Sequence, residues 1–154
     1  MNTIRLPQST PVFDYFPPRE DQFIGLLSIP HSGETIPSEF LPYLSGDERA
    51  YKEDVDFKVN ELVDIQALQN AGIAVIVAHV HRICIDLNRA ENASFMFWKQ
   101  NTHGKPLVVK EADKEVERKL LDKYYLPYFE MLKNIMKRLE ETKSGLVSEV
   151  DLHS

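Results

Sequence analysis

The chain of 154 residues contains a single cysteine, Cys84, which excludes an internal disulfide and suits a reducing compartment. It also lacks a long apolar run. The longest, Ile73–Ala78, is far shorter than the roughly 20 residues that span a bilayer. Residues 1–20 contain no apolar segment of the kind found in signal peptides, so we expect none. These absences predict a cytoplasmic protein.

Positive charge is also sparse in this sequence. The 18 Lys and Arg residues are outnumbered by 24 Asp and Glu, giving a net charge of -6, and no stretch is densely basic. We therefore expect neither a nucleic acid nor an anionic membrane as partner. With 43% hydrophobic residues the chain can bury one sizeable core, which predicts one domain over residues 1–154.

Apolar patterning predicts strands that alternate with helices after an N-terminal arm over residues 1–20. Short apolar runs predict strands at 23–29, 73–78, 83–85 and 146–150. Apolar residues spaced by three and four predict helices at 53–70 and 111–142, the second kinked or divided at Pro127. Over residues 21–154 this order favours an α/β fold, a mixed sheet with helices on both faces.

Two histidine-containing turns follow predicted strands. His31 and Glu34 form an H-x-x-E arrangement after the first strand, and His153 follows the last, two residues after Asp151. Two neutral imidazoles and one carboxylate are the usual ligands of a hydrolytic zinc that keeps a position open for water. Asp151 would fix the tautomer of the His153 ring. The alternatives are a loop histidine beside a solvated Glu34, and a frayed histidine at 153.

A third polar cluster, Asp86-Leu87-Asn88-Arg89, follows the predicted strand at 83–85. Asn88 and Arg89 offer several hydrogen-bond donors, which suits a substrate carboxylate held by the guanidinium. Asp86 would orient a metal-bound histidine, and Arg82 would stabilise a developing oxyanion. The alternative is an Arg–Asp pair at the surface.

The remaining polar candidates are weaker. His79 and His81 alternate on one predicted strand and are expected to be partly buried there, while His103 is expected in a loop. Asp56 is expected near the N-terminus of the first helix, where the helix dipole favours carboxylates. It is a reserve metal ligand in place of Glu34.

Together these strings resemble the N-formylglutamate amidohydrolase family, over residues 23 to 154. The resemblance is carried, in order, by Ser28-Ile29-Pro30-His31-Ser32-Gly33, Ile36-Pro37, Asp56-Phe57, Glu61-Leu62, Arg82-Ile83-Cys84-Ile85-Asp86-Leu87-Asn88-Arg89, Gly104-Lys105-Pro106-Leu107, Tyr124-Tyr125-Leu126-Pro127-Tyr128 and Val150-Asp151-Leu152-His153-Ser154.

The resemblance implies a zinc-dependent amidase of the carboxypeptidase-like (phosphorylase/hydrolase-like) α/β fold. Zinc would be bound by His31, Glu34 and His153 and would activate water to attack the acyl carbon of an N-acyl amino acid. N-formyl-L-glutamate, cleaved to formate and L-glutamate, is the example. The α-carboxylate would be held by Asn88 and Arg89, and Arg82 would polarise the scissile carbonyl.

In the wider carboxypeptidase-like pattern the general-base glutamate follows the third zinc ligand, so we expect that base beyond Ser154. The chain is then either the N-terminal part of such an enzyme or a shortened homologue. Two alternatives remain: a non-catalytic α/β domain that binds a carboxylate or amino acid, and a scaffold that self-associates through an uncovered sheet edge.

Overall fold

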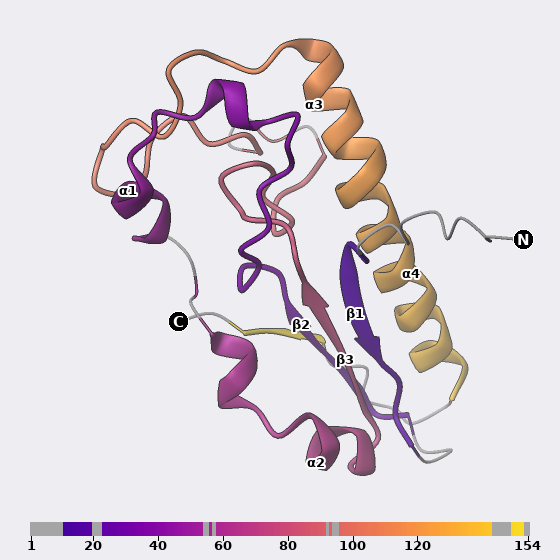
Figure 1. Ribbon diagram of the computed structural model, residues 1–154. Coiled ribbons are helices and arrows are strands. Elements are labelled where there is room, and N and C mark those ends of the chain that lie inside the picture. The colour runs from indigo at the N-terminus through magenta and orange to yellow at the C-terminus, as the bar shows by residue number, and fades with distance from the viewer. Residues whose placement is uncertain are drawn as a thin grey trace, which may run out of the picture.

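A computed structural model describes residues 11–19, 23–53, 56, 58–91, 93, 96–142 and 149–152, and in these a mixed sheet of four strands forms the centre of the molecule (Figure 1). The strand order is β1-β3-β2-β4; β1 is antiparallel to β3, and β2 is parallel to both β3 and β4. The strands are β1 (Phe13–Phe16), β2 (Gly25–Ile29), β3 (Ile73–Ala78) and β4 (Glu149–Asp151).

Helices cover both faces of this sheet because alternate side chains of its central strands point to opposite sides. Ala74 and Ile76 of β3 share a buried cluster with α4 (Leu126–Glu141), whereas Val75 and Val77 share another with side chains of α2 (Ile65–Asn70). In Figure 1, α4 runs along one side of the sheet and α2 lies at its other side. The predicted mixed α/β sheet with helices on both faces is confirmed.

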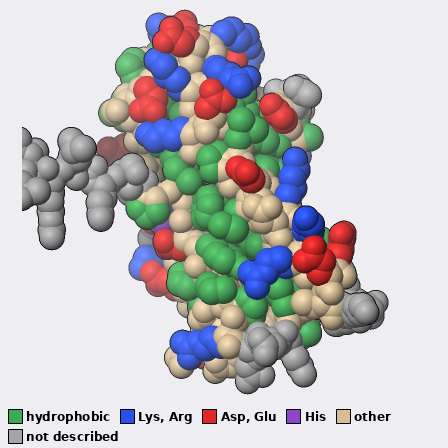
Figure 2. Space-filling view, turned by 90° about the vertical axis from the view of Figure 1, so that its right-hand side faces the viewer, with side chains coloured by type: hydrophobic (Ala, Val, Ile, Leu, Met, Phe, Trp, Pro, Cys, Tyr) green, Lys and Arg blue, Asp and Glu red, His purple; other side chains and the backbone are tan. Residues whose placement is uncertain are grey.

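The predicted long helix is present and is interrupted close to Pro127. The α3 helix (Lys114–Leu120) leads into one wider π-helical turn, η3 (Leu121–Tyr125), and then directly into α4. Proline lacks an N–H and its ring crowds the carbonyl four residues earlier, so a wider turn accommodates it without ending the helix. Figure 2 views the molecule from this side, where apolar side chains gather between charged ones.

The single helix predicted over 53–70 is wrong. In its place lie α1 (Glu48–Lys52), the 3-10 turn η2 (Val59–Leu62) and the short α2, while residues 54, 55 and 57 fall outside the described part. Two aspartates start new helices. Asp47 Oδ1 accepts hydrogen bonds from the N–H groups of Arg49 and Ala50, and Asp64 Oδ1 accepts one from Ala67.

Two other elements differ from the prediction. Residues 13–16, expected in a surface arm, pair with β3 as an edge strand. Residues 83–85, expected as a strand, are not one: residues 82–84 form a turn, closed by the hydrogen bond from the Cys84 N–H to the His81 carbonyl (2.9 Å), and residue 85 follows it. All three side chains are nevertheless fully buried. An apolar run of three residues predicts burial, and the backbone hydrogen bonds decide its shape.

The last strand, β4, begins later than predicted, at Glu149, and residues 143–148 lie outside the described part. It pairs with β2, so that Asp151 lies opposite Ser28 and the Leu152 N–H donates to the Ser28 carbonyl. The end of β4 therefore reaches the carboxyl end of β2, where His31 follows. Among the helices the structure describes, none has the length and apolar character needed to cross a bilayer.

The loop after β2 is joined to the segment after β3 by backbone hydrogen bonds. The Thr35 N–H donates to the His79 carbonyl and the His81 N–H donates to the Thr35 carbonyl, both at 2.9 Å. Gly33 lies so close to this segment that a Cβ atom there would stand 2.4 Å from the His79 carbonyl carbon and 2.5 Å from the Val80 oxygen. Only glycine permits this approach.

Replacing Gly33 by alanine is therefore expected to lower the free energy of unfolding by about 3 kcal/mol, because backbone must move to admit the methyl group. Urea unfolding followed by circular dichroism measures this. Gly104→Ala is the control: Gly104 has a φ of 78° but open space around it, so about 1 kcal/mol is expected. Equal losses in the two variants would contradict the close approach at Gly33.

Candidate active site at the carboxyl ends of β2 and β3

The centre of the candidate site is the fully buried carboxylate of Asp86. Its Oδ1 atom lies 2.7 Å from His31 Nε2 and accepts a hydrogen bond from the Asn88 N–H at 2.9 Å. His31 directly follows Pro30 at the end of β2, and Asp86 follows the turn after β3. Because β2 and β3 are parallel neighbours, their carboxyl ends bring these two residues together.

The other oxygen of Asp86 faces three side chains that carry N–H donors. Trp98 Nε1 donates to Oδ2 at 2.9 Å and Arg82 Nη2 donates at 3.3 Å, while Arg89 Nε lies 3.6 Å away. The Arg82 guanidinium also lies over the Trp98 ring, 4.6 Å from its centre. One carboxylate thus holds an imidazole, an indole and two guanidinium groups in place.

The electrostatics of this cluster keep Asp86 ionised. Burial alone would raise the pKa of the Asp86 carboxyl, because it disfavours the charged form. The hydrogen bond and the charge of His31, the Asn88 N–H and the Arg82 guanidinium outweigh burial and hold that pKa well below its ordinary value. An ionised Asp86 accepts a hydrogen bond from each of these neighbours, so the His31 Nε2 carries the hydrogen of their shared bond.

The second ring nitrogen of His31 faces another carboxylate. His31 Nδ1 lies 3.7 Å from Oδ2 of Asp56, and both residues are buried. An imidazole with a carboxylate on one nitrogen is the usual setting of a metal-ligating histidine, whose other nitrogen then binds the metal. Asp56, the reserve candidate of the sequence analysis, thus lies beside His31.

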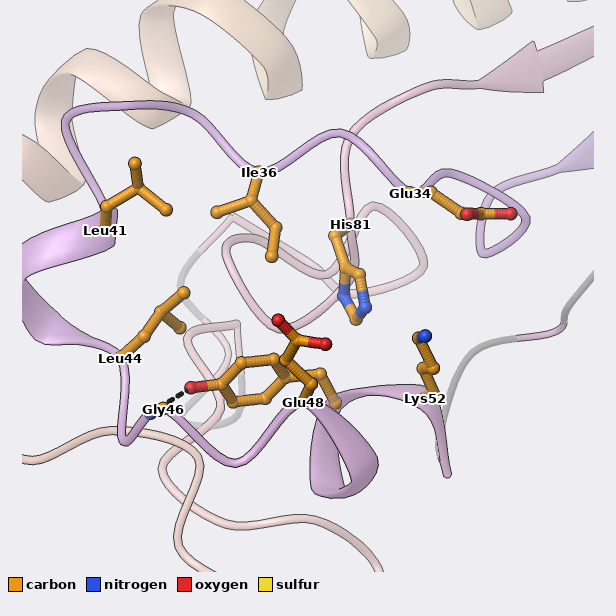
Figure 3. Close-up of a pocket in the computed structure, with 9 residues that line it drawn as sticks. Glu34, Ile36, Leu41, Leu44, Gly46, Glu48, Lys52 and His81 are labelled. Carbon is orange, nitrogen blue, oxygen red and sulfur yellow. Dashed lines mark hydrogen bonds between the residues drawn. The ribbon is translucent and has the colours of Figure 1, made fainter.

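The other predicted site residues lie at different places. Glu34 is exposed, and Figure 3 shows its carboxylate directed away from the other labelled side chains. Asn88 is exposed beside Arg89, whose side chain is 47% exposed. Asp151 is exposed on β4. His153 lies outside the described residues. Within the described residues, no three His, Cys, Asp or Glu side chains form a group that could hold a metal ion.

Two contributors to the site were not found from the sequence. Trp98 lies in the irregular stretch after Arg89, and its contact with Asp86 spans a turn that no periodicity reveals. Its one signal is that it is the chain's sole tryptophan. The second is Tyr125, whose hydroxyl donates to the Arg89 carbonyl at 2.9 Å and so ties the site to the helix interruption.

A pocket of about 910 Å³ is formed by the loop after β2, by α1 and by His81 (Figure 3). It is lined by Glu34, Ile36, Leu41, Leu44, Gly46, Glu48, Tyr51, Lys52 and His81. Glu34 directly precedes Thr35, whose backbone pairs with that of His81 as described above, and Arg82 directly follows His81. The paired backbone therefore borders the pocket, and the chain continues from it to Arg82, which contacts Asp86.

The His81 ring at this pocket is uncharged at neutral pH. Its burial, with a smaller contribution from the charge of Arg82, lowers the pKa of His81 from 6.5 to about 4. The Ile83 N–H donates to Nδ1 at 3.2 Å, so the proton of the neutral ring is on Nε2. His81 therefore presents an N–H donor, whereas metal binding through Nε2 would require the opposite tautomer.

A family model described as N-formylglutamate amidohydrolase matches residues 25–154. No curated protein matches the chain. The crystal structure of N-formylglutamate amidohydrolase from Ralstonia eutropha JMP134 is similar, with a TM-score of 0.78 and 19% identity over 92% of this chain and 57% of that one. A gene product of Agrobacterium tumefaciens gives 0.68 and 16% over 92% and 56%.

The lowered pKa of His81 predicts a pH dependence of stability. The folded state disfavours the protonated ring, whereas the unfolded chain takes up the proton near pH 6.5. The contribution of the neutral His81 to the free energy of unfolding is therefore fully present above pH 6.5 and is lost as the pH falls toward 4. The asparagine of His81→Asn offers an acceptor to the Ile83 N–H but does not titrate. Between pH 7 and pH 4.5 the wild type should lose roughly 2 to 3 kcal/mol more unfolding free energy than the variant.

Urea unfolding at both pH values provides this comparison. The other ionisable groups along the same pocket, Glu34, Glu48 and Lys52, are present in both proteins, so their effects cancel. Parallel losses in wild type and His81→Asn would show that the ring is accessible to protons in the folded state.

Proposed function

Because the chain belongs to the N-formylglutamate amidohydrolase family, we propose that its site serves metal-dependent hydrolysis of the amide bond of an N-acyl amino acid, such as N-formyl-L-glutamate. The observation that carries this proposal is the Asp86 cluster, which combines one histidine, held on one ring nitrogen and facing a carboxylate with the other, with two guanidinium groups. The chain spans 57% and 56% of the two similar structures, so the activity is proposed for the whole protein that contains this site.

The arginines supply the substrate-binding half of the proposal. Arg82 and Arg89 share the single carboxylate of Asp86, so the three groups together keep one positive charge. Arg89 is half-exposed and Asn88 is exposed beside it, so both can reach a ligand. A guanidinium and an amide are suited to an α-carboxylate, which accepts two parallel hydrogen bonds from arginine.

His31, His153 and one carboxylate are proposed as the zinc ligands. Two ligand atoms of a tetrahedral zinc, each about 2.1 Å from the metal, stand roughly 3.4 Å apart. The 3.7 Å between His31 Nδ1 and Asp56 Oδ2 is close to that value, which supports Asp56 as the carboxylate in preference to Glu34. Leu152 reaches the end of β2 through its bond to Ser28, which supports His153 as the third ligand.

The protein groups would then divide the work. A bound zinc would lower the pKa of its water to about 7 and so provide a nucleophile at neutral pH. Asp86 holds the His31 ring by its Nε2 hydrogen and leaves Nδ1 directed toward Asp56. Arg82, fixed by Asp86 and the Trp98 ring, is proposed to donate to the acyl oxygen as negative charge develops there.

The metal assignment predicts a pattern of zinc contents in the purified protein. The wild type should hold about one zinc per chain, and His31→Ala and His153→Ala should lose it. Asp56→Asn should weaken zinc binding at least about tenfold, whereas Glu34→Gln should retain it. Elemental analysis and competition with a chromogenic chelator measure both quantities. Loss in Glu34→Gln with retention in Asp56→Asn would assign the carboxylate to Glu34 instead.

The substrate assignment can be measured through Trp98. Trp98 is the sole tryptophan and contacts both Arg82 and Asp86. Its fluorescence should therefore change when N-formyl-L-glutamate binds. Arg89→Ala should weaken binding about 10- to 100-fold, the loss expected for a charge-assisted hydrogen bond. The control is Arg118→Ala on α3, which removes an exposed ion pair with Asp122. Equal affinity in Arg89→Ala and wild type would refute the proposed carboxylate site.

A formate-release assay, read beside these two measurements, separates the enzyme from a non-catalytic binding domain. Formate release in the presence of zinc supports the amidohydrolase. Binding of the amino acid without zinc uptake and without formate release would favour the binding domain.

A further inference from the structure

We infer that Asn101 is a positioning residue for the proposed zinc site, because it holds the end of α1 where the following chain places Asp56 beside His31. The inference rests on the proposed function, since it takes Asp56 as the zinc carboxylate. It concerns a segment to which that proposal gives no part, residues 99–107, called here the 99–107 loop. This loop contains the Gly104-Lys105-Pro106-Leu107 motif of the sequence analysis.

The α1 helix is too short to fix its own position. It has five residues, Glu48–Lys52, whereas isolated helices shorter than about 12 residues are marginal in water. Ala50 and Tyr51 bury one side of it in the core, and the chain leaves the helix at Glu53. With at most about 3.6 Å per residue, Asp56 lies no more than about 11 Å further along the chain. The position of Glu53 therefore limits where Asp56 can lie.

The side chain of Asn101 holds this end of α1. Asn101 is only 3% exposed, and its Nδ2 donates to Glu53 Oε2 at 2.7 Å and to the Ala50 carbonyl at 3.5 Å. Its Oδ1 accepts from the N–H groups of His103 (3.0 Å) and Lys105 (2.8 Å), which fixes the orientation of the amide. Any other orientation would leave buried polar groups unpaired, so the amide transmits the position of the loop to Glu53.

The 99–107 loop is itself fixed to the core. Leu107 is fully buried, and its N–H donates to the Lys99 carbonyl at 2.9 Å, which closes the loop. Gly104 makes the turn within it with a φ of 78°. The Leu107 carbonyl accepts from the Ser45 N–H at 2.9 Å, shortly before α1 begins. The loop therefore contacts the chain on both sides of α1.

The chain after Asp56 is held separately. Val59 is 1% exposed in the core, and its N–H donates to the Asp56 carbonyl at 3.2 Å. Between them Lys58 adopts a φ of 58°, a left-handed conformation that a residue other than glycine keeps only where the surrounding structure imposes it. Asp56 thus lies in a segment held at both ends, by Val59 and by the contact of Asn101 with Glu53. Releasing one end allows the segment to relax.

A second contact joins the loop to the same carboxylate. Lys105 forms an ion pair with Glu53, but the two side chains are 44% and 24% exposed. Exposed ion pairs contribute little, because water screens the charges and two long side chains lose freedom. The positioning is therefore assigned to the buried amide of Asn101.

The experiment measures the zinc affinity of the full chain, by competition with a chromogenic chelator, in wild type and Asn101→Asp. The aspartate keeps an oxygen for the loop N–H groups, but it removes both donors and repels Glu53. Zinc affinity should fall at least about tenfold, because Asp56 is no longer held beside His31. N-formyl-L-glutamate affinity without zinc, read from Trp98 fluorescence, should change less than about twofold, since Asp86 rather than α1 holds the arginines.

Two further variants address the same contact. Glu53→Ala removes it at a side chain that is 24% exposed, so folding should be retained and zinc affinity should again fall. This variant decides the question if Asn101→Asp does not fold. Combining Asn101→Asp with Glu53→Gln exchanges the amide and the carboxylate, and zinc affinity should return to within about threefold of wild type.

Thr142→Ala is the control for a general loss of stability. It removes the hydrogen bond from the Thr142 hydroxyl to the Phe23 carbonyl at the end of α4. This change weakens the packing of that helix end but touches neither α1 nor the 99–107 loop, so zinc affinity should be unchanged.

Each outcome has a defined meaning. Loss of zinc affinity that is recovered in the exchanged pair, with N-formyl-L-glutamate affinity retained, supports the inference. Wild-type zinc affinity in Asn101→Asp and Glu53→Ala overturns it and leaves the proposed zinc site standing. An equal loss in Thr142→Ala, or an equal loss of N-formyl-L-glutamate affinity, also overturns it, since the effect is then a general loss of structure. Absence of zinc from the wild type refutes the proposed zinc site and this inference with it.

Discussion

The buried carboxylate of Asp86 is the interaction on which the site depends. An unpaired charge in a protein interior is so unfavourable that it persists only with partners that satisfy it. Here the partners come from four separate places in the sequence: His31 after β2, Arg82 in the turn after β3, the Asn88–Arg89 backbone and side chain, and Trp98. Satisfying one carboxylate therefore fixes the relative positions of all the groups to which we assign chemistry.

The rest of the fold supplies the conditions for that cluster. Parallel pairing of β2 with β3 brings the two strand ends together, and Gly33 lets the loop after β2 lie directly on the segment after β3. From the helical side, Tyr125 holds the Arg89 backbone and Tyr128 shares a hydrogen bond with Ser28 of β2. The interruption near Pro127 thus belongs to the part of the helix that supports the site.

Much of the fold could be predicted because it depends on local patterns. Short apolar runs located β2 and β3, and the regular spacing of apolar residues located α3 and α4. The prediction of one helix over 53–70 was wrong because the spacing of apolar residues continues across Val63, whose backbone is extended. Asp64 then caps a new helix. The strand predicted at 83–85 was wrong because burial alone does not distinguish a strand from a buried turn. Both errors concern backbone hydrogen bonds.

The candidate site was predictable to the extent that its residues follow strands. His31, Arg82, Asp86 and Arg89 meet because strand ends meet, which the motifs indicated. The position of Asp56 beside His31 was not predictable, because it depends on how the segment after α1 folds back rather than on spacing. The H-x-x-E pattern favoured Glu34 as the carboxylate, yet Glu34 is directed toward solvent beside the pocket.

The central claim is that one carboxylate organises both the metal half and the substrate half of the site. It is tested most directly by measuring zinc affinity and N-formyl-L-glutamate affinity on the same preparation of Asp86→Asn, with circular dichroism to confirm folding. The account predicts that both affinities fall at least about tenfold, because His31 and the two arginines lose their common anchor. If either affinity stayed at its wild-type value in the folded variant, the two halves would be independent and the account would be wrong.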